Sequence, residues 1–158
     1  MARDYKDSLA AAAQSGREPD QIALAALGET DRILTAALQY LARTAALIDD
    51  GRLSAEVDTR EAEDGSQQTV DGQPEALESK PAADRSAWSE ALRVRGTVAT
   101  AVERVLSLVS RNRGPAPLAF DEPYAKRMAD LALYVRQHHA MRDDAQLGKM
   151  TLKGEHLW

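Results

Sequence analysis

The chain has 158 residues, which is enough for one domain with a real core, and a formal net charge of -5 at pH 7. It contains no cysteine, and this excludes disulfides, thiolate zinc sites and iron–sulfur clusters. Much of the apolar content is alanine and there is a single phenylalanine, so the composition predicts a helical protein rather than a sheet protein.

No apolar run approaches the roughly 18 residues that a membrane span needs. The first residues, Met1 to Asp7, alternate in charge and lack the apolar run of a signal peptide. Basic residues outnumber acidic ones modestly in the C-terminal half, with few aromatics between them, which does not favour nucleic-acid binding. We therefore expect a soluble, cytoplasmic protein that binds neither membranes nor nucleic acid.

The N-terminal segment, residues 1–19, contains an alanine-rich stretch from Leu9 to Ala13 that stops at Ser15-Gly16. A first long helix is predicted to follow, with Asp20 as its N-cap and Gly51 ending it after two aspartates. Its apolar residues recur mostly at spacings of three and four, which predicts one buried face. They are Ile22, Leu24, Leu27, Ile33, Leu34, Leu38, Leu41, Ala45 and Ile48.

Residues 52–80 are acidic and poor in bulky apolar side chains. Such a stretch cannot bury enough apolar surface to offset the entropy that ordering would cost. We interpret it as a flexible acidic loop within the domain.

A second long helix is predicted to start near Ala82–Asp84 and to run to about Asn112, with a valine-rich apolar stripe. Gly114-Pro115 breaks it. Asp121 is then the predicted N-cap of a third helix, which continues from Tyr124 through Leu147. Residues 149–158 are interpreted as a C-terminal tail.

These elements predict an all-α protein, an antiparallel up-and-down bundle of three to four helices over residues 20–148. Three helices bury their apolar stripes less completely than four. Either the N-terminal segment supplies the fourth helix or another chain does, so we expect a homo-oligomer.

The order of these features resembles the C-terminal helical domain of the flavin-dependent acyl-CoA dehydrogenase family, over roughly residues 29 to 148. In that family a helix ends at an aliphatic residue, an acid and a glycine. A long alanine- and valine-rich helix follows, and an arginine-bearing helix comes after a glycine-containing turn. The matching stretches are Asp31–Gly51, Leu92–Leu106 and Gly114–Ala140.

The departures from the family pattern concern catalysis. The family's N-terminal helical domain and middle β-domain are absent, as are its arginine-glutamine-phenylalanine-glycine segment and its usual carboxylate base. Ser110–Gly114 replaces the family's glycine pair. The resemblance therefore implies a non-catalytic or accessory subunit that self-associates or packs on a flavoenzyme partner. No cofactor is expected on the chain alone, and FAD is expected only together with such a partner.

By the same resemblance, Arg136 and Gln137 lie near the nucleotide end of the cofactor, and with Arg113 they are candidate cofactor-binding residues. A guanidinium group suits bidentate contacts with phosphate or carboxylate. The alternative for Arg136 is an ion pair across the bundle. Arg113 is explained equally well by its favourable position at a helix C-terminus.

A metal site is the outside alternative. His139 and Asp143 are four residues apart and share one helix face, as metal ligands on helices often do. His138 points about 100° away from His139, and no third ligand stands at a fixed spacing. The competing interpretation is that one histidine packs against the protein and the other faces solvent.

Three hypotheses follow from the sequence. The first is an accessory protein like the acyl-CoA dehydrogenase C-terminal domain, with no catalytic residues of its own. The second is a generic helical protein-interaction module. The third is a metal-dependent enzyme that uses His138, His139 and Asp143.

Overall fold

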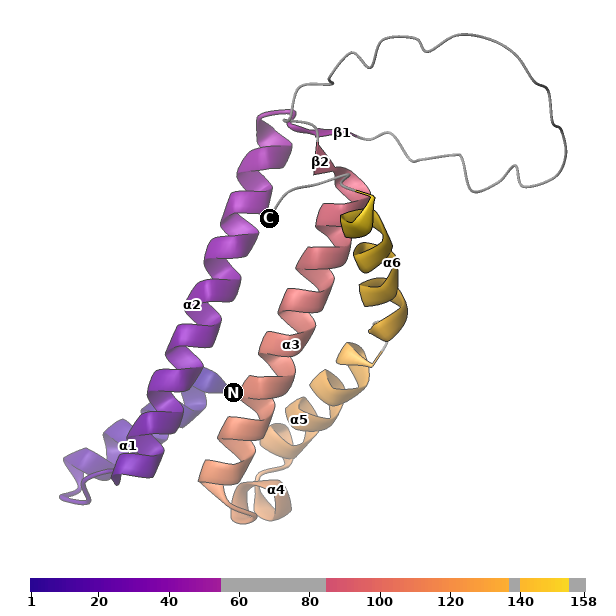
Figure 1. The fold of residues 1–158 in the computed structure, drawn as a ribbon. Helices are drawn as coiled ribbons and strands as arrows, with labels where there is room; N and C mark the ends of the chain where they lie inside the picture. Colours follow the sequence, from indigo (N-terminus) through magenta and orange to yellow (C-terminus); the bar gives the residue numbers. More distant parts are fainter. Residues whose placement is uncertain (55–84, 137–139, 154–158) are drawn as a thin grey trace, which may run out of the picture.

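A computed structural model describes residues 1–54, 85–136 and 140–153 (Figure 1). The described residues are predominantly helical, which confirms the all-α prediction. The helices are α1 (Ala2–Gln14), α2 (Gln21–Asp49), α3 (Ala87–Arg113), α4 (Ala116–Phe120), α5 (Glu122–Val135) and α6 (Met141–Leu152). Two short strands, β1 (Leu53–Ser54) and β2 (Arg85–Ser86), pair in parallel where α2 ends and α3 begins.

The helices are arranged around α3, which is the central rod (Figure 1). Helices α2 and α3 run antiparallel and pack along each other, while α5 and then α6 return along another side of α3. Helix α1 lies against the lower ends of α2 and α3, and α4 turns the chain between α3 and α5.

Two predicted N-caps are confirmed. The Asp20 carboxylate accepts a hydrogen bond from the Ala23 backbone N–H at 2.7 Å and starts α2. The Asp121 carboxylate accepts one from the Tyr124 N–H at 3.0 Å and starts α5. These bonds satisfy backbone donors that have no partner inside the first helical turn. Gly51, at a φ of +65°, ends the α2 segment in the left-handed region that suits glycine.

Three helix boundaries differ from the prediction. Helix α3 begins at Ala87 rather than near 82–84, because Arg85 and Ser86 pair as a strand with Leu53 and Ser54. The predicted third helix is two helices, since α5 ends at Val135 and Ala140 has a φ of 37°, which no α-helix accommodates. Helix α6 continues to Leu152, into the predicted tail. The acidic loop lies outside the described residues from position 55 onward.

The core lies at the end of the molecule where α1 meets α2, α3 and α5. Tyr5 and Tyr124 are fully buried there, and the Tyr5 hydroxyl donates a hydrogen bond to the Ala23 carbonyl at 3.0 Å. The N-terminal segment thus supplies a further helix, α1, to this end. The core cluster consists of Tyr5, Ala26, Val105, Leu108, Val109 and Tyr124.

The prediction of one buried face on α2 is wrong at the start of the helix, where Ile22 and Leu24 are exposed, and in its second half. The buried residues of α2 are Ala26, Thr30, Ala37 and Leu47, which lie on the face toward α3. Leu38 and Ile48, which the prediction placed on the buried face, are 64% and 60% exposed. Helix α2 therefore carries two apolar faces, of which one is only partly covered in the described part of the chain.

Candidate functional site

A buried carboxylate ties α2 to α3 at the end away from the core. Glu90 is fully buried, and its Oε1 accepts a hydrogen bond from the Thr44 hydroxyl at 2.9 Å. Arg93 Nη1 lies 3.4 Å from Oε2, and Arg43 Nη1 lies 3.9 Å from Oε1. A buried carboxylate needs such partners, because its isolated charge would be costly in the interior. These contacts give Glu90 a structural role that joins two helices.

Tyr40 stands beside this carboxylate. Burial raises the pKa of Tyr40 above its ordinary value of 10.0, and the negative charge of Glu90 raises it further. The positive charges of Arg93 and Arg43 act in the opposite direction on the same pKa without reversing it. The phenol is therefore protonated at neutral pH and is not available as a base.

A shallow open groove of about 460 Å³ runs over α3 between α2 and α6. Its floor contains Gly96, where an added Cβ would meet Asp144 Oδ1 at 3.7 Å. Arg93 lines the groove, and its guanidinium group forms an ion pair with Glu90. The lining residues are Tyr40, Leu92, Arg93, Gly96, Thr97, Thr100, Asp144 and Leu147.

The predicted cofactor-binding residues do not come together. The Arg113 guanidinium carbon lies 4.5 Å from the centre of the Tyr124 ring, a cation–π contact near the start of α5. Arg136 is exposed at the C-cap of α5, at the other end of that helix. Gln137 lies outside the described residues. Arg113 and Arg136 therefore cannot contact one small anion together.

The predicted metal ligands are only partly within the described residues. Asp143 is buried in α6, and its Oδ2 lies 3.4 Å from Arg95 Nη1 of α3. This ion pair fastens α6 to the central helix. His138 and His139 lie outside the described residues. Among the described residues, no group of three or more histidine, cysteine, aspartate or glutamate side chains is arranged to hold a metal ion.

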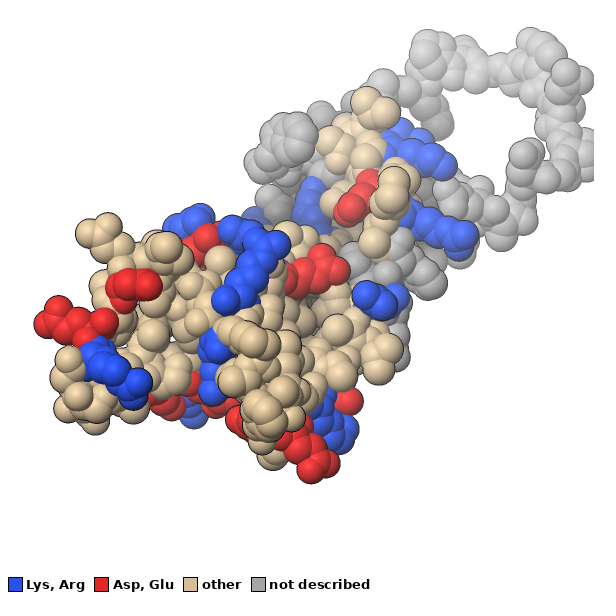
Figure 2. Space-filling view, turned by 90° about the horizontal axis from the view of Figure 1, so that it is seen from below, with Lys and Arg blue, Asp and Glu red and all other residues tan. Residues whose placement is uncertain are grey.

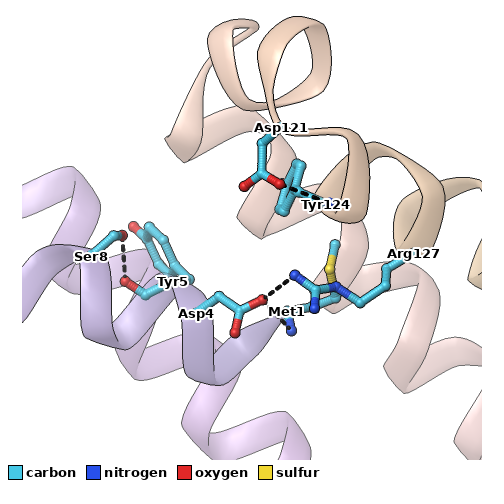
Figure 3. Close-up of polar contacts among 7 residues, drawn as sticks. All are labelled: Met1, Asp4, Tyr5, Ser8, Asp121, Tyr124 and Arg127. Carbon is cyan, nitrogen blue, oxygen red and sulfur yellow. Dashed lines mark hydrogen bonds and ion pairs between the residues drawn. The ribbon is translucent and has the colours of Figure 1, made fainter.

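Polar contacts also fasten α1 at the core end (Figure 3). The Asp4 carboxylate lies 3.3 Å from the N-terminal ammonium and 3.0 Å from Arg127 Nη2 of α5. Burial raises the pKa of Asp4, but the hydrogen bond and charge of the ammonium and the charges of Arg127 and Arg113 outweigh it. The pKa consequently lies below its ordinary 3.8. Seen from this end, acidic and basic residues are interspersed, without a large area of one sign (Figure 2).

A further feature is the second apolar face of α2, which we call the outer stripe. It consists of Leu34, Leu38, Leu41, Ala45 and Ile48, at alternating spacings of four and three. Each member follows by one position a residue of the face toward α3, namely Ile33, Ala37, Tyr40, Thr44 and Leu47. One position is about 100° of rotation, so the outer stripe lies on an adjacent side of the helix. Spacings of four and three are those of helices that pack against a neighbouring helix.

Helix α1 covers only the beginning of this side of α2. Leu27 and Leu34, seven residues apart, pack against the core cluster that contains Tyr5 of α1. With 13 residues, α1 is about 20 Å long, whereas α2 with 29 residues is about 44 Å long. Beyond α1, Leu38, Leu41 and Ile48 remain 64%, 37% and 60% exposed. The outer stripe is thus an apolar helix face with no neighbouring helix in the described part of the chain.

Comparisons of the chain with protein-family models, curated proteins and solved structures find no match. None of the described helices is both long and apolar enough to cross a membrane. The buried ionisable groups Glu90 and Asp143 were not predicted to join helices. The outer stripe had a sequence signal in the adjacent apolar pairs at 33–34, 37–38, 40–41 and 47–48, which indicate two faces rather than one.

Proposed function

We propose that this chain is a non-catalytic helical module that packs against another polypeptide through the outer stripe of α2. The observation that carries the proposal is the exposure of Leu38, Leu41 and Ile48 on one continuous helix face. Single exposed apolar side chains are common, but a regular stripe of them marks an interaction surface. An apolar helix face is a standard means of binding a partner helix or groove.

The non-catalytic part of the proposal rests on how the buried charged groups are used. Glu90 of α3 contacts Thr44 of α2 and Arg93 of its own helix. Asp143 of α6 contacts Arg95 of α3. Groups committed to such contacts stabilise the fold. They are poorly suited to exchange protons with a substrate.

A flavoenzyme subunit is the partner that the acyl-CoA dehydrogenase resemblance implies. In that case FAD would be held by the partner or between the two chains. The flavin content of the purified chain tests this reading. We expect the isolated chain to bind no flavin, and stoichiometric flavin in it would contradict an accessory role.

Photo-cross-linking in cells tests the interaction surface directly. A photoreactive amino acid placed at Leu38 should form an adduct, because this side chain would lie in the interface. The matched control is the same amino acid at Leu133 of α5, since both leucines are 64% exposed. Equal adduct formation at the two positions, or none at Leu38, would contradict the proposed function.

A further inference from the structure

We infer that the polypeptide covering the outer stripe is a second copy of this chain, paired antiparallel through α2. This inference rests on the proposed function and specifies the partner of the same surface. It predicts a two-fold symmetric dimer in which identical faces of the two α2 helices meet.

The outer stripe can pair with itself. An antiparallel arrangement with its two-fold axis midway between Leu41 and Ala45 places Leu38 against Ile48 of the second copy. In the same arrangement Leu41 faces Ala45 of the second copy. Large side chains then meet at the ends of the contact, and each leucine in its middle meets a small alanine. Such alternation lets two helices approach closely without a void.

The position of α1 favours antiparallel over parallel pairing. Helix α1 already lies over the beginning of this side of α2, where Leu27 and Leu34 pack against the core. Parallel pairing would place both copies of α1 side by side at one end of the dimer. Antiparallel pairing places them at opposite ends, so the exposed halves of the two stripes can approach.

Charge favours the same orientation. Asp31 lies on the extension of the outer stripe, three residues before Leu34 and seven before Leu38, and it is exposed. In a parallel, in-register pair it would face Asp31 of the second copy, and like charges in direct contact are unfavourable. In the antiparallel pair, the two Asp31 side chains lie at opposite ends of the contact and do not meet.

The contact is small, because only about four turns of each α2 are free to take part. Stable interfaces bury about 1,200 Å² or more in total, and a single helix pair of this length is at or below that limit. We therefore expect a reversible dimer with a dissociation constant on the order of 1–100 μM.

Sedimentation equilibrium of the purified full chain tests the inference. The wild-type chain should associate to twice its mass as its concentration rises through this range. Leu38→Glu, which places a carboxylate in the interface of each copy, should weaken association by about 100-fold or more. Leu133→Glu, at the equally exposed leucine of α5, should leave the dissociation constant unchanged. Equal effects of the two variants would overturn the inference.

Disulfide trapping tests the orientation, since the natural chain has no cysteine. Mixed samples of Leu38→Cys and Ile48→Cys chains should form the mixed disulfide in preference to either symmetric one. Preference for the two symmetric disulfides would indicate parallel pairing and overturn the antiparallel arrangement.

The two proposals fail in different ways. Suppose that the wild-type chain stays monomeric up to about 100 μM and that position 38 cross-links a different protein in cells. The inference that the partner is a second copy would then be wrong, but the proposed function would stand. Monomeric protein with no cross-link at position 38 would remove both.

Discussion

Glu90 shows how a single buried side chain can join two helices. It is fully buried between α2 and α3 and contacts Thr44, Arg93 and Arg43. We predict that Glu90→Ala lowers the free energy of unfolding by about 2–4 kcal/mol, because it empties a buried site and leaves the partly buried donors of Thr44 and Arg93 without their acceptor. Urea denaturation measures this change.

The control is a carboxylate in an exposed ion pair. Asp130 lies 2.7 Å from Lys126 on the surface of α5, and Asp130→Ala should change stability by no more than about 0.5 kcal/mol. A loss for Glu90→Ala as small as this would show that the polar cluster does not hold α2 and α3 together.

Tyr5 gives a pH dependence with a defined sign. Burial, and secondly the charge of Asp20, raise the pKa of Tyr5 above its ordinary 10.0. The fold thus favours the neutral phenol, and this stabilisation is complete below pH 10.0 and is lost as the pH rises through the folded-state pKa. The side chain in Tyr5→Phe cannot ionise. When the pH is raised from neutral to above 10.0, the free energy of unfolding of this variant should therefore fall less than that of the wild type.

Urea denaturation at both pH values checks this prediction. At neutral pH, Tyr5→Phe should be less stable by about 1 kcal/mol, because it lacks the hydrogen bond to the Ala23 carbonyl. Tyr134→Phe, at an exposed tyrosine, is the control. If all three proteins lost the same stability at alkaline pH, the buried phenol of Tyr5 would not be the cause.

At the scale of the helices, capping explains where α2 and α5 begin. The Asp20 carboxylate accepts the Ala23 N–H at 2.7 Å. We predict that Asp20→Ala destabilises the protein by about 1 kcal/mol, whereas Asp20→Asn, which keeps an acceptor, costs less. The order of their thermal midpoints measures this difference. Equal losses for the two variants would mean that the side-chain acceptor does not stabilise the helix start.

The sequence predicted the starts of α2 and α5 well because a capping aspartate is a local signal. It did not predict the break between α5 and α6, since Ala140 takes its φ of 37° without a glycine or proline at that position. The sequence also did not predict that α1 begins at Ala2, since the helix signal in this segment was the alanine-rich stretch from Leu9 to Ala13. Tyr5, which precedes that stretch, anchors α1 in the core. Tertiary contact outweighed the local pattern in this segment.

The same limit applies to the candidate site. Glu90 near the start of α3 would ordinarily be assigned to the surface, because its burial depends on Thr44 and Arg43 from another helix. Trp88, a large apolar residue near the start of the predicted second helix, is 45% exposed. Periodicity shows that apolar residues share a face. It does not show whether the chain itself supplies a neighbour for that face.

At the scale of the whole molecule, the described helices are covered unevenly. Four helices enclose the core at one end, whereas α2, α3 and α6 at the other end are joined by buried apolar residues such as Leu47 and Leu92 together with the polar contacts of Glu90 and Asp143. The exposed residues of the outer stripe, Leu38, Leu41 and Ile48, lie where α1 no longer reaches. A partner on these residues would complete the packing that α1 begins, which is why we propose association as the function.

Thiol labelling of the outer stripe tests this account most directly. A single-cysteine Leu38→Cys chain should react rapidly with a thiol reagent when dilute and progressively more slowly as its concentration rises through the micromolar range. Leu133→Cys, at a leucine of equal exposure, should react at a constant rate. Two results would contradict this account. If Leu38→Cys reacts slowly at every concentration, the stripe is already covered within one chain. If it reacts rapidly at every concentration, as Leu133→Cys does, no second copy covers it.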